Sequence, residues 1–369
     1  MAWVPTGRAL LGLLAAGAMA TTTGGCGSGT STPGFESLSG SGTGGAGTGG
    51  ASSSSIGGGG AATTSSASGG AEPEKLGPPY PIVLAHGFFG FDDFAGAGFL
   101  TYYYQVVDHL ADHGEPLVFT PTVDPFNSSA YRGAQLVDRI EEILAQTGHA
   151  KVNIVGHSQG GLDARVVAHD RPDLVASVIS LQTPHGGTPI ADVALELVTD
   201  PNLAGVLDFL AQAVGAPLYD EVNEQTSLAD ALYQFSQPGI AAFDAAYPDQ
   251  PGIYYASIAG RSDYHPGGSD CDAPDAPSFV SDFDGELDPI DPLFDIPEQI
   301  VDGGFGSAIV NDGLVRAEDA RHGVFLGCVP ADHLDMVGQL LGDEPGLFND
   351  WDYLQFYVDL IGHLRAQGL

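Results

Sequence analysis

The sequence predicts an α/β fold in residues 78–369, with a mainly parallel central sheet that helices cover on both faces. Strand-like and helical segments alternate along this part of the chain. The strand-like segments are apolar at consecutive positions, as in strands that are buried on both faces of a sheet. The length is ample for one large domain with a full hydrophobic core.

The first half of the domain shows the alternation most plainly. An apolar strand is expected at 82–85, a helical stretch around 104–112 and a second strand at 116–123. The segment 132–148 carries apolar residues at helical spacing and stops at a glycine, which predicts an amphipathic helix. A third apolar strand is expected at 151–155.

The second half continues the pattern with longer interruptions. A helix is expected directly after residue 158, and a buried strand at 174–184. The stretch 261–306 is dense in Asp, Pro and Gly and predicts loops. A strand-like run at 307–310 follows, and the chain closes on a helical segment at 352–367.

Residues 186–250 interrupt this alternation and predict a helical lid insertion. An apolar stripe at helical spacing comprises Leu203, Val206, Leu207, Leu210 and Val214. Periodicity alone favours a cap helix packed on the domain, with a mobile lid over an apolar site as the alternative.

The N-terminal part predicts export. Residues 1–26 contain one arginine and then an apolar run that is too short to span a bilayer. Their end at Cys26 resembles a bacterial lipoprotein signal whose cysteine is acylated, with Thr23 where Leu is usual. We expect a lipid anchor at the cell envelope, with ordinary cleavage and secretion as the alternative. Residues 27–77, rich in Gly, Ser and Thr, predict a disordered linker.

The charge of the chain is strongly negative. There are 47 acidic residues against 11 basic ones, a net charge of −36. No basic patch is available to neutralise phosphates, which excludes nucleic acid as a partner. The acidity is consistent with calcium binding or with life in salty water, where screening relieves self-repulsion.

The chain has three cysteines, Cys26, Cys271 and Cys328. If Cys26 is acylated, an even pair remains in the folded domain, as an oxidising compartment favours. We therefore expect Cys271 and Cys328 to be bonded to each other.

A serine between glycines, in "VNIVGHSQGGLDARVVA", is the first candidate for chemistry. Ser158 stands where a β-branched, buried strand becomes a helix. The glycines fit a tight turn without chemistry. They fit equally a nucleophile elbow, a turn so sharp that the serine Oγ is exposed at the edge of the sheet.

A nucleophilic serine needs a base, and the base needs a carboxylate that fixes its tautomer. Asp312 follows the strand-like run at 307–310, so its carboxylate is expected at the same sheet edge, and His333 comes after it. Of the other histidines beyond Asp312, His322 is the alternative base and His363 belongs to the last helix. The order serine, acid, histidine favours catalysis by Ser158, Asp312 and His333.

Six motifs resemble the secreted bacterial triacylglycerol lipases of the Pseudomonas and Burkholderia type. They are "YPIVLAHGFFGFD", "KVNIVGHSQGG", "RPDLVASVISLQTPHGG", "LDPIDPLF", "NDGLV" and "HLDMVGQLLG". They span nearly the whole domain, from Tyr80 to about Gly342. The resemblance implies an α/β-hydrolase fold, a lid and hydrolysis of long-chain glyceride esters.

Residue by residue, the resemblance assigns the catalytic groups. Ser158 matches the nucleophile, Asp312 the acid and His333 the base. Phe88 and Gln159 match the two donors of the oxyanion hole. Both would act through their backbone N–H groups, so their side chains matter less.

The same resemblance implies a structural calcium ion that fixes the histidine loop. Its ligands map onto Asp288, Asp335, Gln339 and the backbone carbonyl at Asp343. Two carboxylates with carbonyl oxygens suit a hard cation. No organic cofactor is implied.

The chain also departs from the family's pattern. The family's disulfide has its second cysteine a few residues after "NDG", where this chain has Glu318, so the geometry of a Cys271–Cys328 bond is not implied by the resemblance. The lipid-anchor signal and the linker are additions to the lipase domain, and the lid region matches poorly.

We therefore expect an exported triacylglycerol lipase that meets its lipid substrate at an oil–water or membrane interface. A carboxylesterase or phospholipase with the same triad is the alternative, because the elbow does not identify the leaving group. Many relatives need a membrane-tethered foldase, a further possible partner. A non-catalytic binding protein on this fold is disfavoured, since all three triad positions are filled.

Overall fold

A computed structural model describes part of the chain. The described residues are 74–88, 101–197, 225–262, 267–289, 294–303, 309–339, 345 and 349–369. The predictions for the export signal and for Cys26 lie outside the described residues, as does nearly all of the predicted linker.

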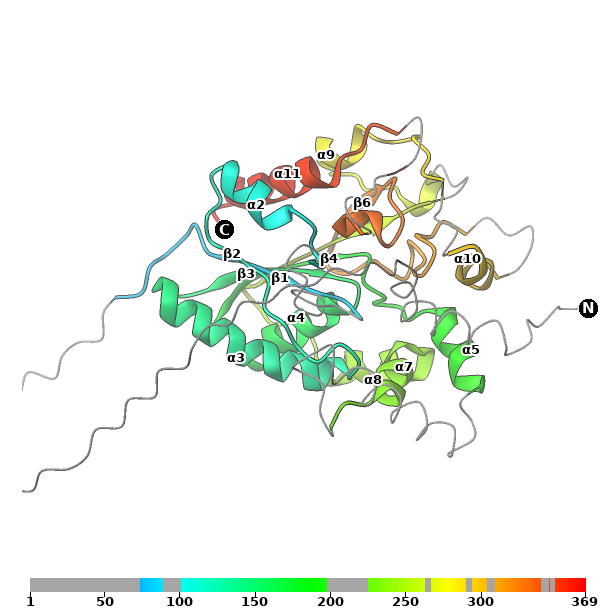
Figure 1. Cartoon of the computed structure of the whole chain (residues 1–369), viewed down its shortest axis with the longest axis horizontal. Coiled ribbons are helices and arrows are strands. Elements are labelled where there is room, and N and C mark those ends of the chain that lie inside the picture. Colours follow the sequence, from blue (N-terminus) through cyan, green and yellow to red (C-terminus); the bar gives the residue numbers. More distant parts are fainter. Residues whose placement is uncertain are drawn as a thin grey trace, which may run out of the picture. The chain divides into compact units, whose positions relative to one another are not determined.

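The described strands form one parallel sheet (Figure 1). Their order is β2-β1-β3-β4-β5-β6, and every neighbouring pair runs parallel. The strands are β1 (Ile82–Ala85), β2 (Val118–Phe119), β3 (Val152–His157), β4 (Val175–Leu181), β5 (Tyr254–Gly260) and β6 (Val324–Val329). The parallel sheet predicted from the continuous apolar segments is confirmed.

Helices follow most strands, as crossover connections between parallel strands require. They are α2 (Val106–Asp112), α3 (Ser129–Thr147), α4 (Gln159–Asp170), α5 (Pro189–Leu197), α7 (Leu228–Phe235), α8 (Gln237–Ala246), α9 (Ser278–Ser281), α10 (Asp295–Val301) and α11 (Tyr353–Ala366). Two short 3-10 turns are η2 (Gly268–Asp270) and η4 (Asp335–Val337). None of the helices in the described part is long and apolar enough to cross a membrane.

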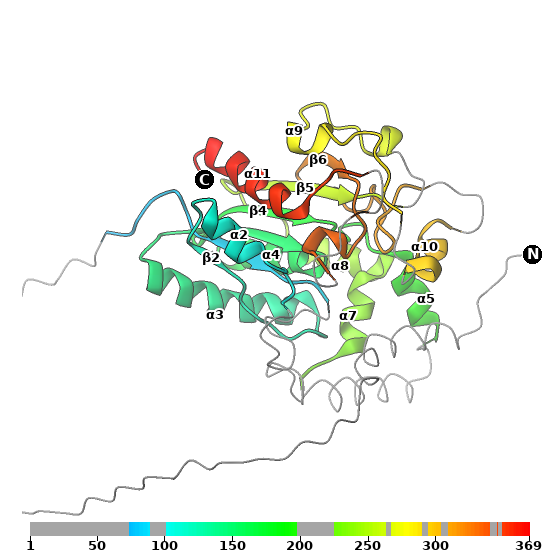
Figure 2. The same ribbon diagram turned by 45° about the horizontal axis from the view of Figure 1, so that its top comes forward.

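Helices lie on both sides of the sheet (Figure 2), and a hydrophobic layer fills the space between the sheet and the helices on each side. In β1 the side chains alternate, so that Ile82 and Leu84 pack toward α2 and α11 while Val83 and Ala85 pack toward α3 and α4. All four side chains are buried. This two-sided burial explains the continuous apolar runs in the sequence, because each position of the strand meets a hydrophobic layer.

Helix α3 ends where the sequence predicts. Gly148 adopts φ 75° and its N–H binds the carbonyl of Leu144, a left-handed C-cap that a glycine forms at little cost. The chain beyond it pairs with the start of the domain, since His149 forms an isolated parallel bridge with Leu76.

The sequence did not predict strands β5 and β6. Strands β5 and β6 contain glycine and serine within their apolar runs, which weakens the pattern. Gly327 has φ 118° and lies where the β5–β6 register shifts, so a β-bulge requires this glycine. Conversely, the expected second strand is reduced to the two residues of β2.

The strand predicted at 307–310 is wrong where it is described. Ile309 and Val310 belong to no strand, and the next residue, Asn311, forms only an isolated bridge with Arg316. An apolar run of this length is compatible with any buried segment, and here it packs in a loop beside β6: Val310 shares a hydrophobic cluster with Ala259 and Cys328.

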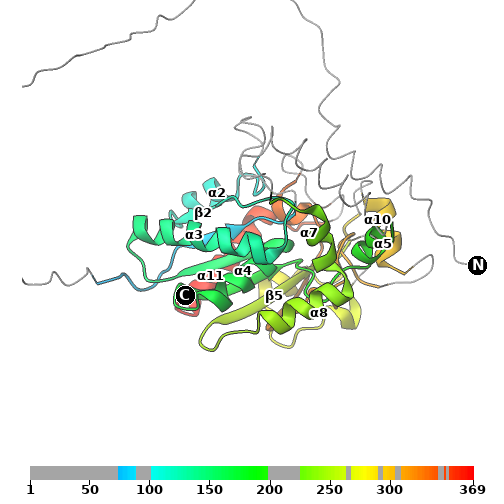
Figure 3. The ribbon, with the colours of Figure 1, turned by 90° about the horizontal axis from the view of Figure 1, so that it is seen from below.

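The predicted lid region is described in part (Figure 3). Helices α5, α7 and α8 pack on α4 through a cluster of Leu162, Val166, Ala191, Phe235, Ile240 and Phe243. These described helices are therefore packed on the domain rather than detached from it. The apolar stripe that includes Leu203 and Val214 lies outside the described residues.

Candidate active site

Ser158 occupies a strained turn between β3 and α4. Its φ is 55° and its ψ is −128°, a conformation that costs a non-glycine residue about 1–3 kcal/mol. A Cβ at Gly156 would lie 2.4 Å from the carbonyl oxygen of Gly160, and one at Gly160 would lie 2.1 Å from that of Ala85. The glycines are needed because strand, turn and helix approach each other so closely, which is the geometry of a nucleophile elbow.

The three residues singled out by their order form one hydrogen-bonded chain. Nε2 of His333 lies 2.9 Å from Oγ of Ser158, and its Nδ1 lies 2.8 Å from Oδ2 of Asp312. A carboxylate only accepts hydrogen bonds, so Nδ1 carries the proton and Nε2 accepts from the serine hydroxyl. Asp312 is buried, and its Oδ1 accepts from the N–H groups of Leu314 and Val315 at 2.9 and 2.7 Å.

Asp312 comes from a loop and not from the end of a sheet strand. The loop that carries His333, which follows β6, is attached to it directly, since the N–H of His333 binds the carbonyl of Asp312 at 2.9 Å. Thr188 donates to the carbonyl of Leu314 at 2.7 Å and holds the other side of the acid loop. Acid and base thus sit on neighbouring loops whose backbones are joined.

The alternative histidines lie elsewhere. His322 faces Asp249 at 2.9 Å and stacks on His185, with ring centroids 4.5 Å apart. His363 belongs to α11 and contacts the ring of Phe279. Neither is in the hydrogen-bonded chain of Ser158.

The two predicted oxyanion-hole residues flank the serine. Gln159 is the first residue of α4, where an N–H has no acceptor within the helix. Phe88 follows Gly87, and a Cβ on that glycine would lie 2.7 Å from Cβ of Ser158. The loop after β1 therefore passes directly against the serine, and glycine is required for this approach.

A buried arginine holds this loop. Arg132 of α3 donates to the carbonyl oxygens of His86 at 2.7 Å and Gly87 at 3.3 Å. Its charge is matched by Asp163 of α4 at 2.8 Å, and both side chains are almost completely buried. Because the carbonyl of Gly87 and the N–H of Phe88 belong to one planar peptide unit and point in opposite directions, fixing the carbonyl also fixes the N–H.

Three buried carboxylates meet beside the base loop. Asp288, Asp332 and Asp335 each place an oxygen within 4.8 Å of the others, and their exposed fractions are 1%, 1% and 4%. Carboxylates this close and this buried repel one another unless a cation is present. The donor set therefore fits a hard, oxygen-preferring ion such as calcium.

The other two predicted ligands are Gln339 and Asp343. Gln339 is buried beside this cluster's loop, and its Nε2 donates to the carbonyls of Thr101 and Tyr102 at 2.8 and 2.9 Å. Asp343 lies outside the described residues. Asp332 was not predicted, because in an acid-rich chain nothing in the sequence distinguishes it from its neighbours. Its Oδ1 also accepts from the N–H of Leu334 at 2.8 Å.

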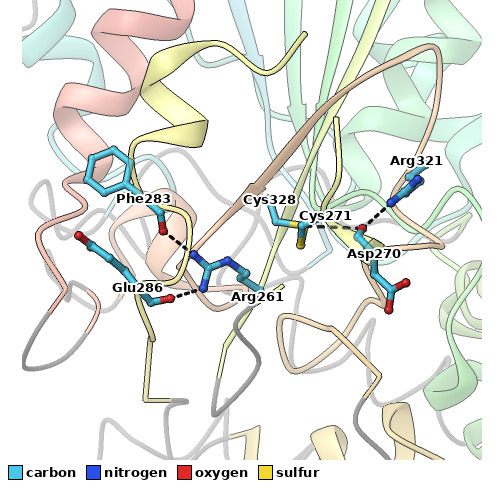
Figure 4. Close-up of a disulfide and its surroundings, with 7 residues drawn as sticks. All are labelled: Arg261, Asp270, Cys271, Phe283, Glu286, Arg321 and Cys328. Atoms are coloured by element: carbon cyan, nitrogen blue, oxygen red, sulfur yellow. Dashed lines mark hydrogen bonds between the residues drawn. A yellow bond between two sulfur atoms is a disulfide. The ribbon is translucent and has the colours of Figure 1, made fainter. Parts of the chain in front are cut away.

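A disulfide joins Cys271 to Cys328, with Cα atoms 5.2 Å apart (Figure 4). It connects the loop before α9 to β6, the strand that leads to His333. Near Asp288, Arg261 donates to the carbonyls of Phe283, at 2.6 Å, and Glu286. The segment that leads to Asp288 is thus attached at its start by the disulfide and shortly before Asp288 by Arg261.

Comparison with known proteins identifies the family. Residues 80–300 match the family model of the α/β hydrolase fold. The chain belongs to the α/β hydrolase family. A triacylglycerol lipase of Vibrio cholerae is 33% identical to this hydrolase over 299 residues, which cover 79% of this chain and 89% of that protein. A triacylglycerol lipase of Pseudarthrobacter phenanthrenivorans is 30% identical over 319 residues, 79% of this chain and 98% of that protein.

Solved structures agree with the fold. The crystal structure of Staphylococcus hyicus lipase aligns with a TM-score of 0.54 at 16% identity and covers 80% of this chain and 96% of that one. A third sequence relative, the triacylglycerol lipase of Burkholderia plantarii, is 29% identical over 319 residues, 79% of this chain and 87% of that protein. The resemblance to the bacterial triacylglycerol lipases and the classification as an enzyme with a hydrolase fold are confirmed.

Proposed function

We propose that this hydrolase cleaves the carboxylic esters of acylglycerols through an acyl-enzyme on Ser158. The position of His333, within 3 Å of both Ser158 and Asp312, is the observation that carries the proposal. The named triacylglycerol lipases among its relatives support the substrate class.

The reaction follows from the hydrogen-bonded chain. Oγ of Ser158 attacks the ester carbonyl carbon while its proton passes to Nε2 of His333. Asp312 stabilises the imidazolium through Nδ1–H. The N–H groups of Phe88 and Gln159 donate hydrogen bonds to the carbonyl oxygen and stabilise the negative charge that develops on it.

Collapse of the tetrahedral intermediate breaks the bond to the glycerol oxygen, and His333 gives this oxygen the proton. A water molecule then attacks the acyl carbon while His333 takes its proton. The bond from this carbon to Oγ of Ser158 breaks, Oγ recovers the proton from His333, and the fatty acid leaves. The buried carboxylate of Asp312 keeps the base in the same tautomer through both halves of the cycle.

A structural calcium ion belongs to the same proposal. Asp288, Asp332 and Asp335 would hold it together with oxygens of Gln339 and Asp343. When bound, the ion neutralises the clustered carboxylates and fixes the loop that carries His333. The protein's own residues perform each proton transfer.

Export and anchoring through Cys26 complete the proposal, on the strength of the signal-like N-terminus. Anchoring through Cys26 would hold the enzyme where insoluble lipid lies, at an oil–water or membrane interface. A membrane-tethered foldase is a proposed partner in its maturation.

The test combines labelling with a substrate series. A serine-directed phosphonate should label Ser158 with loss of activity. In the substrate series, the enzyme should cleave emulsified long-chain triglycerides in addition to soluble short-chain esters. Cleavage of soluble esters alone would favour a carboxylesterase. Release of fatty acid from phospholipids in preference to triglycerides would favour a phospholipase, and labelling without any ester turnover would contradict both.

A further inference from the structure

We propose that Tyr102, His157 and Gln182 form a positioning chain that ties together the loops of the nucleophile, the base and the oxyanion hole. The inference rests on the proposed ester hydrolysis, because it concerns how the reacting groups of that site are held. None of the three side chains transfers a proton to the substrate. They act by fixing the backbone from which the reacting groups project.

The chain is continuous. The hydroxyl of Tyr102 lies 2.7 Å from Nδ1 of His157, whose Nε2 lies 3.0 Å from Oε1 of Gln182. The amide nitrogen of Gln182 then donates to the carbonyls of Ala331, at 3.1 Å, and Asp332, at 3.0 Å. Because the amide oxygen can only accept, His157 carries its proton on Nε2 and accepts the tyrosine hydroxyl on Nδ1.

Each end of the chain meets a loop of the site. The carbonyls that Gln182 binds belong to the two residues directly before His333. In the middle, His157 directly precedes Ser158, and its ring lies 4.7 Å from the ring of His333. At the other end, the Tyr102 hydroxyl is so close to Gly87 that a Cβ there would lie 2.6 Å from it.

The fold sustains strain to keep Gln182 in place. Gln182 has φ 50°, a left-handed conformation that is unusual for a residue with a side chain. A Cβ at Gly260 would lie 1.8 Å from its amide nitrogen, so β5 leaves room for the amide by ending in glycine. Backbone strain at a fully buried glutamine indicates that its exact placement is used by the site.

The chain is also uncharged over a broad pH range. Burial lowers the pKa of His157 well below its ordinary value, and burial raises the pKa of Tyr102. A neutral His157 with its proton on Nε2 keeps the donor and acceptor roles along the chain as the hydrogen bonds require. A neutral ring beside His333 also avoids repulsion with the imidazolium that forms there during the reaction.

The positioning chain matters because the site does not tolerate small displacements of its reacting groups. A displacement of reacting groups by about 1 Å can lower a rate about 100-fold. Loss of one link should shift the base loop relative to Ser158 by less than that, and we expect kcat to fall about tenfold. KM should remain within about twofold, because none of the three side chains is proposed to bind the substrate.

The test compares two tyrosines. Tyr102→Phe removes the hydroxyl that binds His157. The matched control, Tyr255→Phe, removes the hydroxyl of a buried tyrosine at the start of β5, which accepts from the N–H of Gln250 at 3.1 Å and lies outside the site. With calcium present, Tyr102→Phe should lose about tenfold in kcat and in the rate of phosphonate labelling, whereas Tyr255→Phe should stay within about twofold of the unaltered protein.

A second variant addresses the other end. Gln182→Met keeps the volume of the side chain and removes both bonds to the base loop, and it should lower kcat in the same way. Should Gln182→Met fail to fold, Tyr102→Phe decides alone. Equal kcat in the two Phe variants, or a change in KM without one in kcat, would overturn the chain. An unaltered protein that cleaves no ester would instead overturn the proposed function.

Discussion

At the scale of single residues, the elbow makes Ser158 different from every other serine of the chain. We expect Ser158→Ala to lower ester turnover by several orders of magnitude, because the members of a triad act as a unit. Ser180→Ala is the control, since Ser180 lies in the neighbouring strand β4 and outside the site, where it is buried whereas Ser158 is half-buried. Peptide mapping after phosphonate treatment checks the assignment, and a label on any other residue would contradict it.

The choice between two histidines is testable in the same assay. His333→Ala should abolish turnover, since Nε2 of His333 is the group that accepts the serine proton. His322→Ala should keep most of the activity, because His322 is engaged with Asp249. The initial rates of both variants on a soluble ester decide the matter. The assignment fails if the His322 variant is the inactive one.

Asp319 provides a prediction about pH. Burial raises the pKa of its carboxyl to about 6. The negative charge of Glu318 also raises this pKa, and the positive charge of Arg316 lowers it. The folded state therefore holds this proton more tightly than the unfolded state. Its contribution to stability is fully present below pH 3.8 and is lost as the pH rises through about 6.

Asp319→Asn should remove that loss. The melting temperature of the variant should match the unaltered protein near pH 4 and exceed it above pH 6. Solvent screening limits the gain to roughly 1 kcal/mol, or about 2–4 °C. Melting curves of both proteins at pH 4, 5, 6 and 7 give the comparison, and a difference that is constant with pH would show that the carboxyl is not responsible.

The sequence predicted the site residues that motifs can carry, and missed those that tertiary contact creates. Ser158, Asp312 and His333 were chosen by their order along the chain, and the structure places them in hydrogen-bond contact. Asp332 and Gln182 have no such signal. Their roles depend on loops from distant parts of the chain that meet only in the folded protein.

At the scale of elements, the same limit applies to the strands. Continuous apolar runs predicted β1, β3 and β4, because these strands are buried on both faces of the sheet. Strand β6 was missed because its bulge needs a glycine. Strand β5 was missed because it ends in Gly260, which leaves room for the side chain of Gln182 at the end of the neighbouring strand β4. Such glycines look like loop residues until the packing is known.

The disulfide gives a prediction at this scale. Cys271 and Cys328 are separated by 57 residues, and closing a loop of that length stabilises a protein by about 2–4 kcal/mol. Thiol titration of the unfolded, unreduced domain should find neither cysteine free. The variant with Cys271→Ser and Cys328→Ala should melt at a lower temperature, and an unchanged melting curve would contradict the expected stabilisation.

At the scale of the whole molecule, the net charge of −36 sets the background for any metal site. An acidic surface is stabilised by any salt, because screening weakens the repulsion between its charges. A specific ion acts differently, since it binds the folded state alone. At a hundredfold excess over its dissociation constant, such an ion adds about 2.7 kcal/mol by mass action.

Calcium should therefore do more than salt. Chelation should lower both the melting temperature and the activity, because the clustered carboxylates of Asp288, Asp332 and Asp335 then repel and loosen the base loop. Added calcium should restore both beyond what sodium chloride achieves at matched ionic strength. Calcium should also act better than magnesium, since loop oxygens form a large and flexible cage.

Two substitutions of equal charge separate the site from the surface. Asp335→Asn should abolish the specific calcium response and keep the general salt response. Asp138→Asn, on the exposed face of α3, removes the same charge and should leave the calcium response intact. Thermal melts with calcium, magnesium and sodium chloride measure both responses. If sodium chloride rescues the chelated protein fully, or if both variants respond to calcium alike, the three carboxylates bind no structural ion and the acidity serves the surface alone.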